Sequence, residues 1–334
     1  GKVLRIDSRV MSVIVGVLLI CGFGTADDLA DQANRISALE KEGQLPQALA
    51  VLSHLVADLQ QRDPANERLP EAFDRKGSIE ADMGRYREAE QDYVKAIGLW
   101  KNLHKSASAA FATELNNLSS LYSVTGRPRE AETLRRESLA LRLDLLGPDS
   151  LEVALSYSNL AVDLFRQGQY RESVELCHKA LAIWSTSDSE RNRSDLAYHT
   201  LASIELKSGD FPSALAHALA AVAQYRTNQN STASTMATYQ DTVALAREAN
   251  GDLTGSAQDF ASAIAHLEIS EHKQPSLSHI GLLIDYAKLL TRQKHAREAK
   301  RLLREAQSEA TAIAQANQWQ HAVDVTALLI RKQR

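Results

Sequence analysis

The chain has 334 residues and a formal net charge of −4, with interspersed signs and, on this reading, no basic block. This pattern gives little electrostatic support for nucleic-acid binding, so no nucleic-acid partner is expected. Ala and Leu are the most frequent residues, and together with the many Glu, Arg and Gln residues they are good helix formers. No segment alternates β-branched residues, and we therefore expect an all-α protein with almost no sheet.

The first 28 residues have the layout of a secretory signal. Lys2, Arg5 and Arg9 precede an apolar run over residues 11–21, and small residues surround a possible cleavage site after Ala26. The run is shorter than the roughly 20 apolar residues that a membrane span needs. We therefore expect a signal peptide over residues 1–26 and an exported chain, periplasmic or secreted. The alternative is a chain anchored by an uncleaved N-terminal segment.

A glycine recurs along the rest of the chain at intervals of 41 or 42 residues: Gly43, Gly84, Gly126, Gly168, Gly209 and Gly251. Lys294, 43 residues after the last of these, occupies the same place in a seventh copy. Five residues after each of these seven anchors comes a small residue: Ala48, Ala89, Ala131, Ser173, Ala214, Ser256 and Ala299. A fixed period of this length predicts a solenoid of stacked repeats.

The copy around Gly168 shows how one repeat is built. The preceding segment, LEVALSYSNLAVDLFRQ, has apolar residues at three- and four-residue steps, which predicts an amphipathic helix. Gly168 ends this helix in the left-handed conformation that glycine adopts at low cost. Tyr170 opens a second helix, on which Ser173, Cys177 and Ala180 form a stripe of small residues. This stripe lets two antiparallel helices pack closely, and Cys177 is expected to be an ordinary core residue.

The positions of the seven prolines agree with these predicted helix boundaries. Pro46, Pro128 and Pro212 fall at the start of second helices, where the missing N–H costs nothing. The others are expected between repeats, where helices stop: Pro64, Pro70, Pro148 and Pro275.

We therefore expect a right-handed superhelical solenoid of antiparallel helix pairs over residues 27–307. It has about seven repeats, near residues 29–64, 70–105, 112–147, 154–189, 195–228, 237–270 and 280–310. Residues 308–334 are expected to form a C-terminal capping helix, because an open solenoid end must be shielded from water.

These repeats resemble the tetratricopeptide repeat (TPR) family. Two features resemble the kinesin-light-chain type of that repeat: the period near 42 residues, and the sequence of residues 113–150, TELNNLSSLYSVTGRPREAETLRRESLALRLDLLGPDS. The likeness covers roughly residues 29–307 and is best in the second to fourth copies. It implies that the first helices line a concave groove for a peptide or protein partner.

Polar residues of the first helices are the candidate groove residues: Arg75, Asn116, Asn117, Asn159, Arg166, His199 and Lys207. Asn117 and Asn159 lie 42 residues apart in equivalent places. A ladder of such amides can pair with the backbone of an extended peptide without reading its side chains. The resemblance implies the same use, and the alternative is that an exposed asparagine is merely tolerated there.

No catalytic motif, phosphate-binding loop or metal-ligand spacing occurs in the sequence. We therefore expect no enzyme, no cofactor and no metal, and a membrane contact only if the N-terminal segment stays uncleaved. The leading hypothesis is an exported scaffold or adaptor that binds a peptide or protein partner in its groove. The alternative is a structural component that self-assembles, or joins an envelope complex, through its convex face or its ends. A catalytic site that the sequence does not reveal is the third hypothesis.

Overall fold

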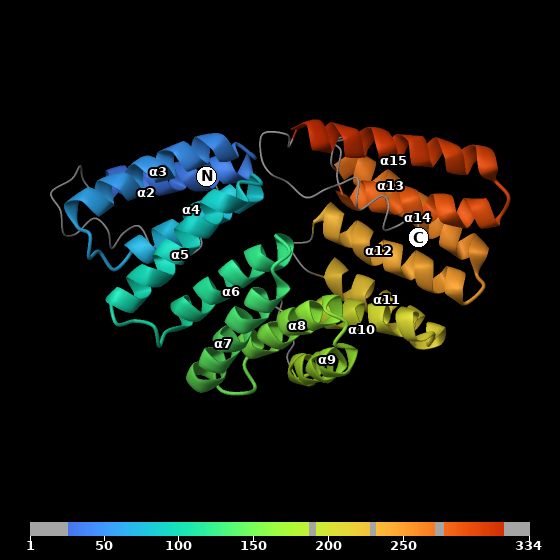
Figure 1. Cartoon of the computed structure of the whole chain (residues 1–334), viewed down its shortest axis with the longest axis horizontal. Coiled ribbons are helices and arrows are strands. Elements are labelled where there is room, and N and C mark those ends of the chain that lie inside the picture. Colours follow the sequence, from blue (N-terminus) through green and yellow to red (C-terminus); the bar gives the residue numbers. More distant parts are fainter. Residues whose placement is uncertain (1–25, 187–191, 228–231, 271–276, 317–334) are drawn as a thin grey trace, which may run out of the picture. The chain divides into compact units, whose positions relative to one another are not determined.

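The computed structural model describes residues 26–186, 192–227, 232–270 and 277–316. In these ranges the chain forms fourteen α-helices and no strand (Figure 1), which confirms the all-α prediction. The predicted signal segment lies outside the described residues, apart from Ala26. Two compact units divide the chain: unit 1 is Gly1–Leu145 and unit 2 is Leu146–Arg334.

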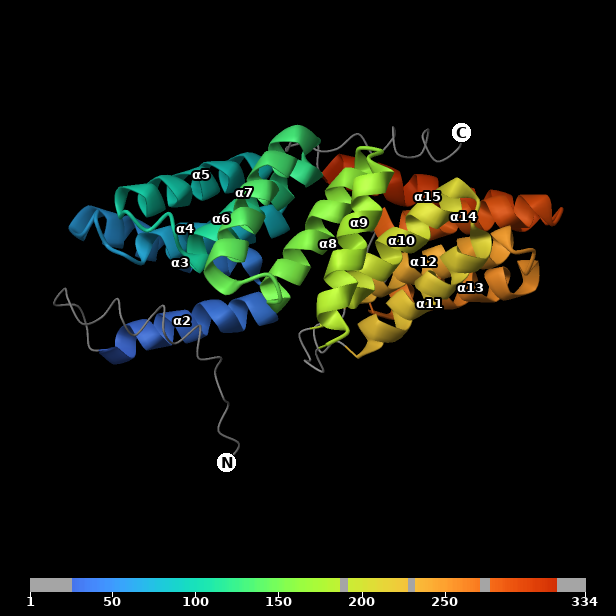
Figure 2. The ribbon, with the colours of Figure 1, turned by 90° about the horizontal axis from the view of Figure 1, so that it is seen from below.

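Unit 1 contains three helix pairs: α2 (Ala26–Lys41) with α3 (Leu45–Arg62), α4 (Leu69–Asp82) with α5 (Tyr86–Asn102), and α6 (Ala109–Val124) with α7 (Pro128–Leu146). Unit 2 contains four: α8 (Leu151–Arg166) with α9 (Tyr170–Trp184), α10 (Ser194–Ser208) with α11 (Phe211–Arg226), α12 (Ala233–Ala249) with α13 (Leu253–Ser270), and α14 (Leu277–Arg292) with α15 (Ala296–Ala316). Within unit 2 each pair packs on the next, as the two views show (Figures 1 and 2). The seven predicted helix pairs are thus confirmed.

The seven anchors all lie in the left-handed region, with φ between 65° and 86°. At Gly168 the backbone closes the helix end in two hydrogen bonds: Gly168 N–H donates to the Phe165 carbonyl over 3.0 Å, and Gln169 N–H donates to the Leu164 carbonyl over 2.8 Å. The same pair of bonds closes α14, where the anchor is Lys294. The predicted turn geometry is therefore confirmed, with one lysine holding a conformation that favours glycine.

The small residues that follow the anchors are fully buried in every copy, at 0–2% exposure. Cys177 is also buried, as expected of a core residue, and burial raises the pKa of its thiol to about 12. Close helix contact requires small side chains at these positions. The repeat is therefore held together by the pattern from which it was predicted.

The predicted positions of five prolines relative to the helices are confirmed, and one predicted position is wrong. Pro46, Pro128 and Pro212 lie in the first turns of α3, α7 and α11, and Pro64 and Pro148 lie between helices. Pro70 does not separate two repeats but lies buried in the first turn of α4, which begins at Leu69. The first turn tolerates proline because its N–H groups have no partner inside the helix. Pro275 lies outside the described residues.

The last helix in the described part of unit 2 is α15. Residue 308, where a capping helix was predicted to begin, falls inside this helix. Buried residues continue at three- and four-residue steps past that point: Ala299, Leu302, Ala306 and Ala310. Residues 317–334 lie outside the described part of the chain.

Candidate functional site

Arg75 of α4 is held by the helix before it. Its guanidinium donates two hydrogen bonds to the Glu40 carboxylate of α2, over 3.1 and 2.7 Å, and a third to the Ser37 hydroxyl over 3.1 Å. A two-bonded arginine–carboxylate pair has a fixed geometry. Arg75 therefore ties two first helices together, and a partner's carboxylate would have to compete with Glu40.

The amides of Asn116 and Asn117 on α6 also have partners inside unit 1. Asn117 Nδ2 donates to Asp74 Oδ1 of α4 over 2.8 Å, and Asn116 Oδ1 accepts from Arg135 Nη1 of α7 over 2.9 Å. Burial raises the pKa of Asp74, and the hydrogen bond from Asn117 opposes that shift. The bond uses one of the two N–H donors of Asn117. Among the described residues, its amide oxygen and second N–H form no further hydrogen bond.

Sequence reasoning missed Glu114, which lies one turn before these amides. Glu114 is 2% exposed, and its Oε1 has no hydrogen-bond partner among the described residues. Burial, and then the nearby charge of Asp74, raise the pKa of its carboxyl to about 10, so it is neutral at pH 7. One signal for it is present in the sequence: Glu114 shares the helical face of Phe111, Leu115 and Leu118.

His199 of α10 belongs to a polar network in unit 2. Its Nε2 lies 3.0 Å from Thr242 Oγ1, and its ring stacks on Tyr239 with centroids 4.6 Å apart. The Thr242 hydroxyl donates to the Thr238 carbonyl, so Nε2 carries the proton that bonds to Thr242. Burial lowers the pKa of His199 to about 4, against a smaller opposing effect of Asp195. The imidazole is therefore neutral at pH 7 and offers no cation to a partner.

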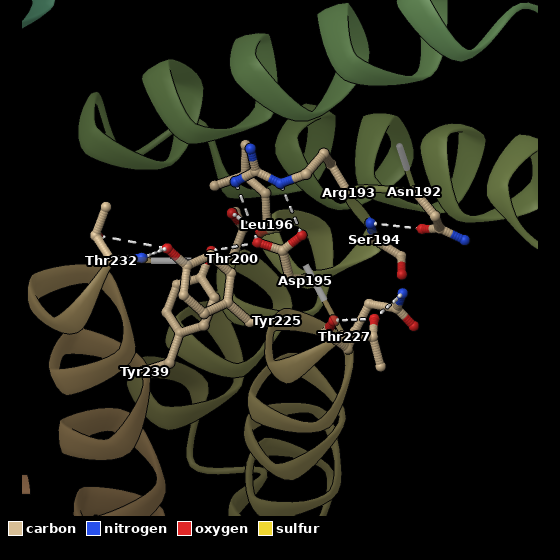
Figure 3. Close-up of polar contacts among 11 residues, drawn as sticks. Asn192, Arg193, Ser194, Asp195, Leu196, Thr200, Tyr225, Thr227, Thr232 and Tyr239 are labelled. Carbon is tan, nitrogen blue, oxygen red and sulfur yellow. Dashed lines mark hydrogen bonds and ion pairs between the residues drawn. The ribbon is translucent and has the colours of Figure 1, made fainter. Parts of the chain in front are cut away.

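Asp195 is the centre of this network (Figure 3). It is fully buried, and Arg193 donates to both of its oxygens over 3.0 and 3.3 Å. The Tyr239 hydroxyl, from α12, donates to Oδ2 over 2.9 Å. On the same side, the Tyr225 hydroxyl accepts from Thr232 N–H over 2.7 Å. Charge and hydrogen bonds are thus matched inside the core, which indicates a structural role for these residues.

The remaining candidates lie on the surface or near it. Arg166 and Lys207 are exposed in the last turns of α8 and α10, where a cation complements the helix dipole. Asn159 is half-buried in the middle of α8. Asn117 and Asn159 belong to different units, so the proposed ladder between them stays a prediction.

One register recurs in these contacts. Polar side chains of successive first helices bond to each other at separations of 43 or 44 residues: Asn117–Asp74, His199–Thr242, Tyr239–Asp195, Ser278–Ser234 and Arg292–Glu248. The sequence separation of the two residues in each contact therefore exceeds the repeat period by one or two residues. Much of the polar face of the first helices holds neighbouring repeats together.

The described ranges give little support for a metal site, a membrane span or a ligand pocket at the candidate residues. They contain no cluster of three or more His, Cys, Asp or Glu side chains that could hold a metal ion. None of the described helices is long and apolar enough to cross a membrane. A shallow hollow of about 600 Å³ lies at the α8–α9 turn, lined by Gly168, Gln169, Tyr170, Arg171, Glu172 and Glu175. No candidate groove residue lines it.

Comparison with known families decides what kind of repeat this is. A family model described as tetratricopeptide repeat matches residues 110–172 and 152–227, and a second model of that description matches residues 70–99. These residues form tetratricopeptide repeats. Such repeats are typically non-enzymatic scaffolds for protein interactions, although the fold alone does not exclude catalysis. A comparison with curated proteins gives no significant match.

Solved structures of other repeat proteins are similar to the chain. A putative kinesin light chain with nearly identical TPR-like repeats from Podosopora anserina is 21% identical, with a TM-score of 0.50, over 62% of this chain and 98% of that one. A tetratricopeptide repeat protein from Parabacteroides merdae is 16% identical, with a TM-score of 0.57, over 84% and 92%. The apo form of RapI is 14% identical, with a TM-score of 0.65, over 83% and 97%. At these identities the likeness supports the fold alone.

Proposed function

We propose that this chain is a non-enzymatic scaffold that binds an extended peptide or protein partner along the polar faces of its first helices. The observation that carries the proposal is the state of Asn117. Its hydrogen bond to Asp74 fixes the side chain, and the amide oxygen and second N–H have no partner among the described residues. An amide held in this way is ready to accept from, and donate to, a peptide backbone.

Two other candidate groove residues are less available to a partner than Asn117. Arg75 is engaged by Glu40, and His199 is neutral and bonded to Thr242. Neither is well suited to hold a partner's carboxylate. In this proposal Asn117 makes the main backbone contact in unit 1, while Asn159 takes the equivalent position on a first helix of unit 2.

The test is a pull-down from envelope extract with three forms of the chain: the parent, Asn117→Ala, and Asn102→Ala as the matched control. Asn102 is exposed at the end of α5 and outside the candidate groove. A protein retained by the parent and by Asn102→Ala, and lost by Asn117→Ala with an unchanged melting temperature, supports the proposal. Equal retention by all three forms contradicts it. A mass that rises with concentration would then favour self-assembly through the convex face or the ends.

We also propose that the chain is exported. The basic residues, the short apolar run and the small residues before Ala26 support a cleavable signal. Mass spectrometry of the protein from its native cell tests this directly. A new N-terminus at Asp27 in an exported fraction supports cleavage. A chain that keeps residues 1–26 and sediments with membranes supports the uncleaved anchor.

A further inference from the structure

Charge is unevenly distributed within unit 2. Residues 146–287 carry seventeen acidic and nine basic residues, whereas residues 288–304 carry seven Lys or Arg and the single acid Glu298. The expectation of interspersed signs with no basic block is therefore wrong for this segment. A strongly positive stretch thus spans the end of α14 and the first half of α15 in a chain with negative net charge.

The fold gathers most of these charges on one face. Arg297, Lys300, Arg301 and Arg304 follow one another at helical spacing on α15, and all four are exposed. The opposite face of α15 packs into the core through Ala299 and Leu302, among others. Together with Lys294 at the α14–α15 turn, these four cations form what we call the basic face. In Figure 1 α15 is the red helix.

The basic face lacks the ion-pair partners that several other cations of unit 2 have, although Arg166, Lys207 and Arg226 are unpaired among the described residues as well. Arg193 pairs with Asp195, Arg247 with Asp259, and Arg292 with Glu248. In the described part of the chain, no ion pair involves any member of the basic face: Lys294, Arg297, Lys300, Arg301 and Arg304. These eleven residues hold five cations and one acid, Glu298, so the segment keeps a net positive charge that an anion lying against it would stabilise.

Lys294 gives a second, independent reason to expect a ligand. It has φ +65° at an anchor where the other six copies have glycine. A side chain in the left-handed region is strained, and glycine would remove the strain. A strained residue that adds a charge to an unpaired cluster points to use of that charge.

We propose that the basic face binds an anionic phospholipid surface, independently of the N-terminal segment. Clusters of four to eight Lys and Arg on one helix face suit anionic headgroups, and arginine bonds phosphate through two N–H groups at once. The outer face of α15 continues through Ser308 and Thr311, so over residues 296–313, whose side chains the structure describes, it has no large apolar or aromatic side chain. A protein interface would need such anchors, and a single-stranded nucleic acid would need aromatic stacking platforms. The apolar side of α15 is committed to the core, so binding is adsorption without insertion.

The experiment is vesicle flotation with the full chain. Vesicles of phosphatidylcholine with 30% phosphatidylglycerol are compared with pure phosphatidylcholine, at about 0.1 M and 1 M salt. The variant K300Q/R301Q/R304Q removes three charges, and K101Q/R129Q/R226Q removes three exposed cations elsewhere as the matched control. We expect the first variant to lower the partition coefficient for anionic vesicles about 100-fold. The control should bind like the parent, and 1 M salt should abolish binding by both.

A single variant separates charge from folding. Lys294→Gly removes both the strain and one cation, so it should raise the melting temperature while weakening vesicle binding about fivefold. Every form keeps the N-terminal segment, so differences between them report on the basic face. Equal binding to neutral and anionic vesicles, or parent-like binding by K300Q/R301Q/R304Q, overturns the proposal. The proposal is also overturned if the parent does not bind anionic vesicles but binds duplex DNA or polyglutamate through the same three residues.

Discussion

Units 1 and 2 each keep a buried ionisable group neutral, but the group is an acid in unit 1 and a base in unit 2. In unit 1, burial raises the pKa of Glu114 to about 10 and that of Glu80 to about 7, although Lys76 donates to Glu80 over 3.0 Å. In unit 2, Asp195 is buried against Arg193 and Tyr239, and His199 is held neutral with its pKa lowered to about 4.

The difference shows that one repeat fold can accommodate a buried charge either by protonating it or by pairing it. The two neutral groups, Glu114 and His199, respond to pH with opposite signs. A carboxyl with a raised pKa favours the folded state less as pH rises, because the unfolded chain then loses its proton first. An imidazole with a lowered pKa favours the folded state less as pH falls, because the unfolded chain then binds its proton first.

The largest expected effect comes from Glu114→Gln in unit 1. Between pH 4.5 and pH 10 the unfolded carboxyl is ionised while the folded one is protonated, so unit 1 loses stability as pH rises through this window. The neutral amide removes the loss, and we expect the free energy of unfolding to rise by about 3 kcal/mol at pH 7. Hydrogen exchange of peptides from α4–α6 measures this change within unit 1.

Two controls accompany this variant. At pH 4 the carboxyl is protonated in both states, so parent and variant should have the same protection. Glu137→Gln, on the exposed side of α7, should change nothing at either pH. A pH-independent gain from Glu114→Gln would mean that the amide acts through packing, and our account of the buried acid would fail.

A smaller effect of opposite sign is expected from His199→Gln in unit 2. The parent should lose about 2 kcal/mol of local stability in α10–α12 as pH falls from 6.5 to 4, because the unfolded imidazole binds a proton that the folded one excludes. Glutamine keeps an N–H donor for Thr242 and does not titrate, so this loss should disappear. Hydrogen exchange at pH 6.5 and pH 4, corrected for intrinsic rates, measures it. An unchanged acid loss in the variant would assign the effect to other groups.

The sequence predicted the repeat well because the repeat follows local rules. Positive φ at Gly168 and a buried small residue at Ser173 depend on the nearest helix turn and on the facing helix of the same pair. The polar contacts depend on something else. Asn117 meets Asp74 only because successive first helices are offset by one residue from the repeat period. That lateral register is set by packing, and the sequence period alone does not reveal it.

The contacts of the candidate site residues could not be predicted for the same reason. Arg75 and His199 are polar residues on first helices, as expected, but the neighbouring helix supplies a partner for each: Glu40 for Arg75 and Thr242 for His199. Whether a polar side chain faces a partner or a neighbouring repeat cannot be read from one helix. Glu114 was missed because a single acid on an apolar face does not reveal whether a cation lies opposite it.

The smallest expected effect on stability concerns the contact between the two helices of a single repeat. In the second repeat, Gly77 of α4 faces Tyr93 of α5, and a Cβ on Gly77 would lie 3.1 Å from that ring and 3.2 Å from the Ala89 carbonyl oxygen. In the fifth repeat the equivalent positions are Ala202 and Ala218, which pack in one core cluster. The second repeat thus combines glycine with an aromatic ring at a place where the fifth repeat has two small residues.

Gly77→Ala should therefore lower the stability of unit 1 or leave it unchanged, within about 1 kcal/mol, despite the better helix propensity of alanine. The Tyr93 ring cannot easily retreat, because it is buried and its hydroxyl lies 3.2 Å from the Ser78 hydroxyl. Gly98→Ala is the matched control on α5, where an added Cβ meets nothing within 4 Å. It should raise the free energy of unfolding by about 0.5–1 kcal/mol. If thermal melting shows the same gain for both variants, the Gly77–Tyr93 contact is looser than this geometry implies, and helix propensity alone governs both positions.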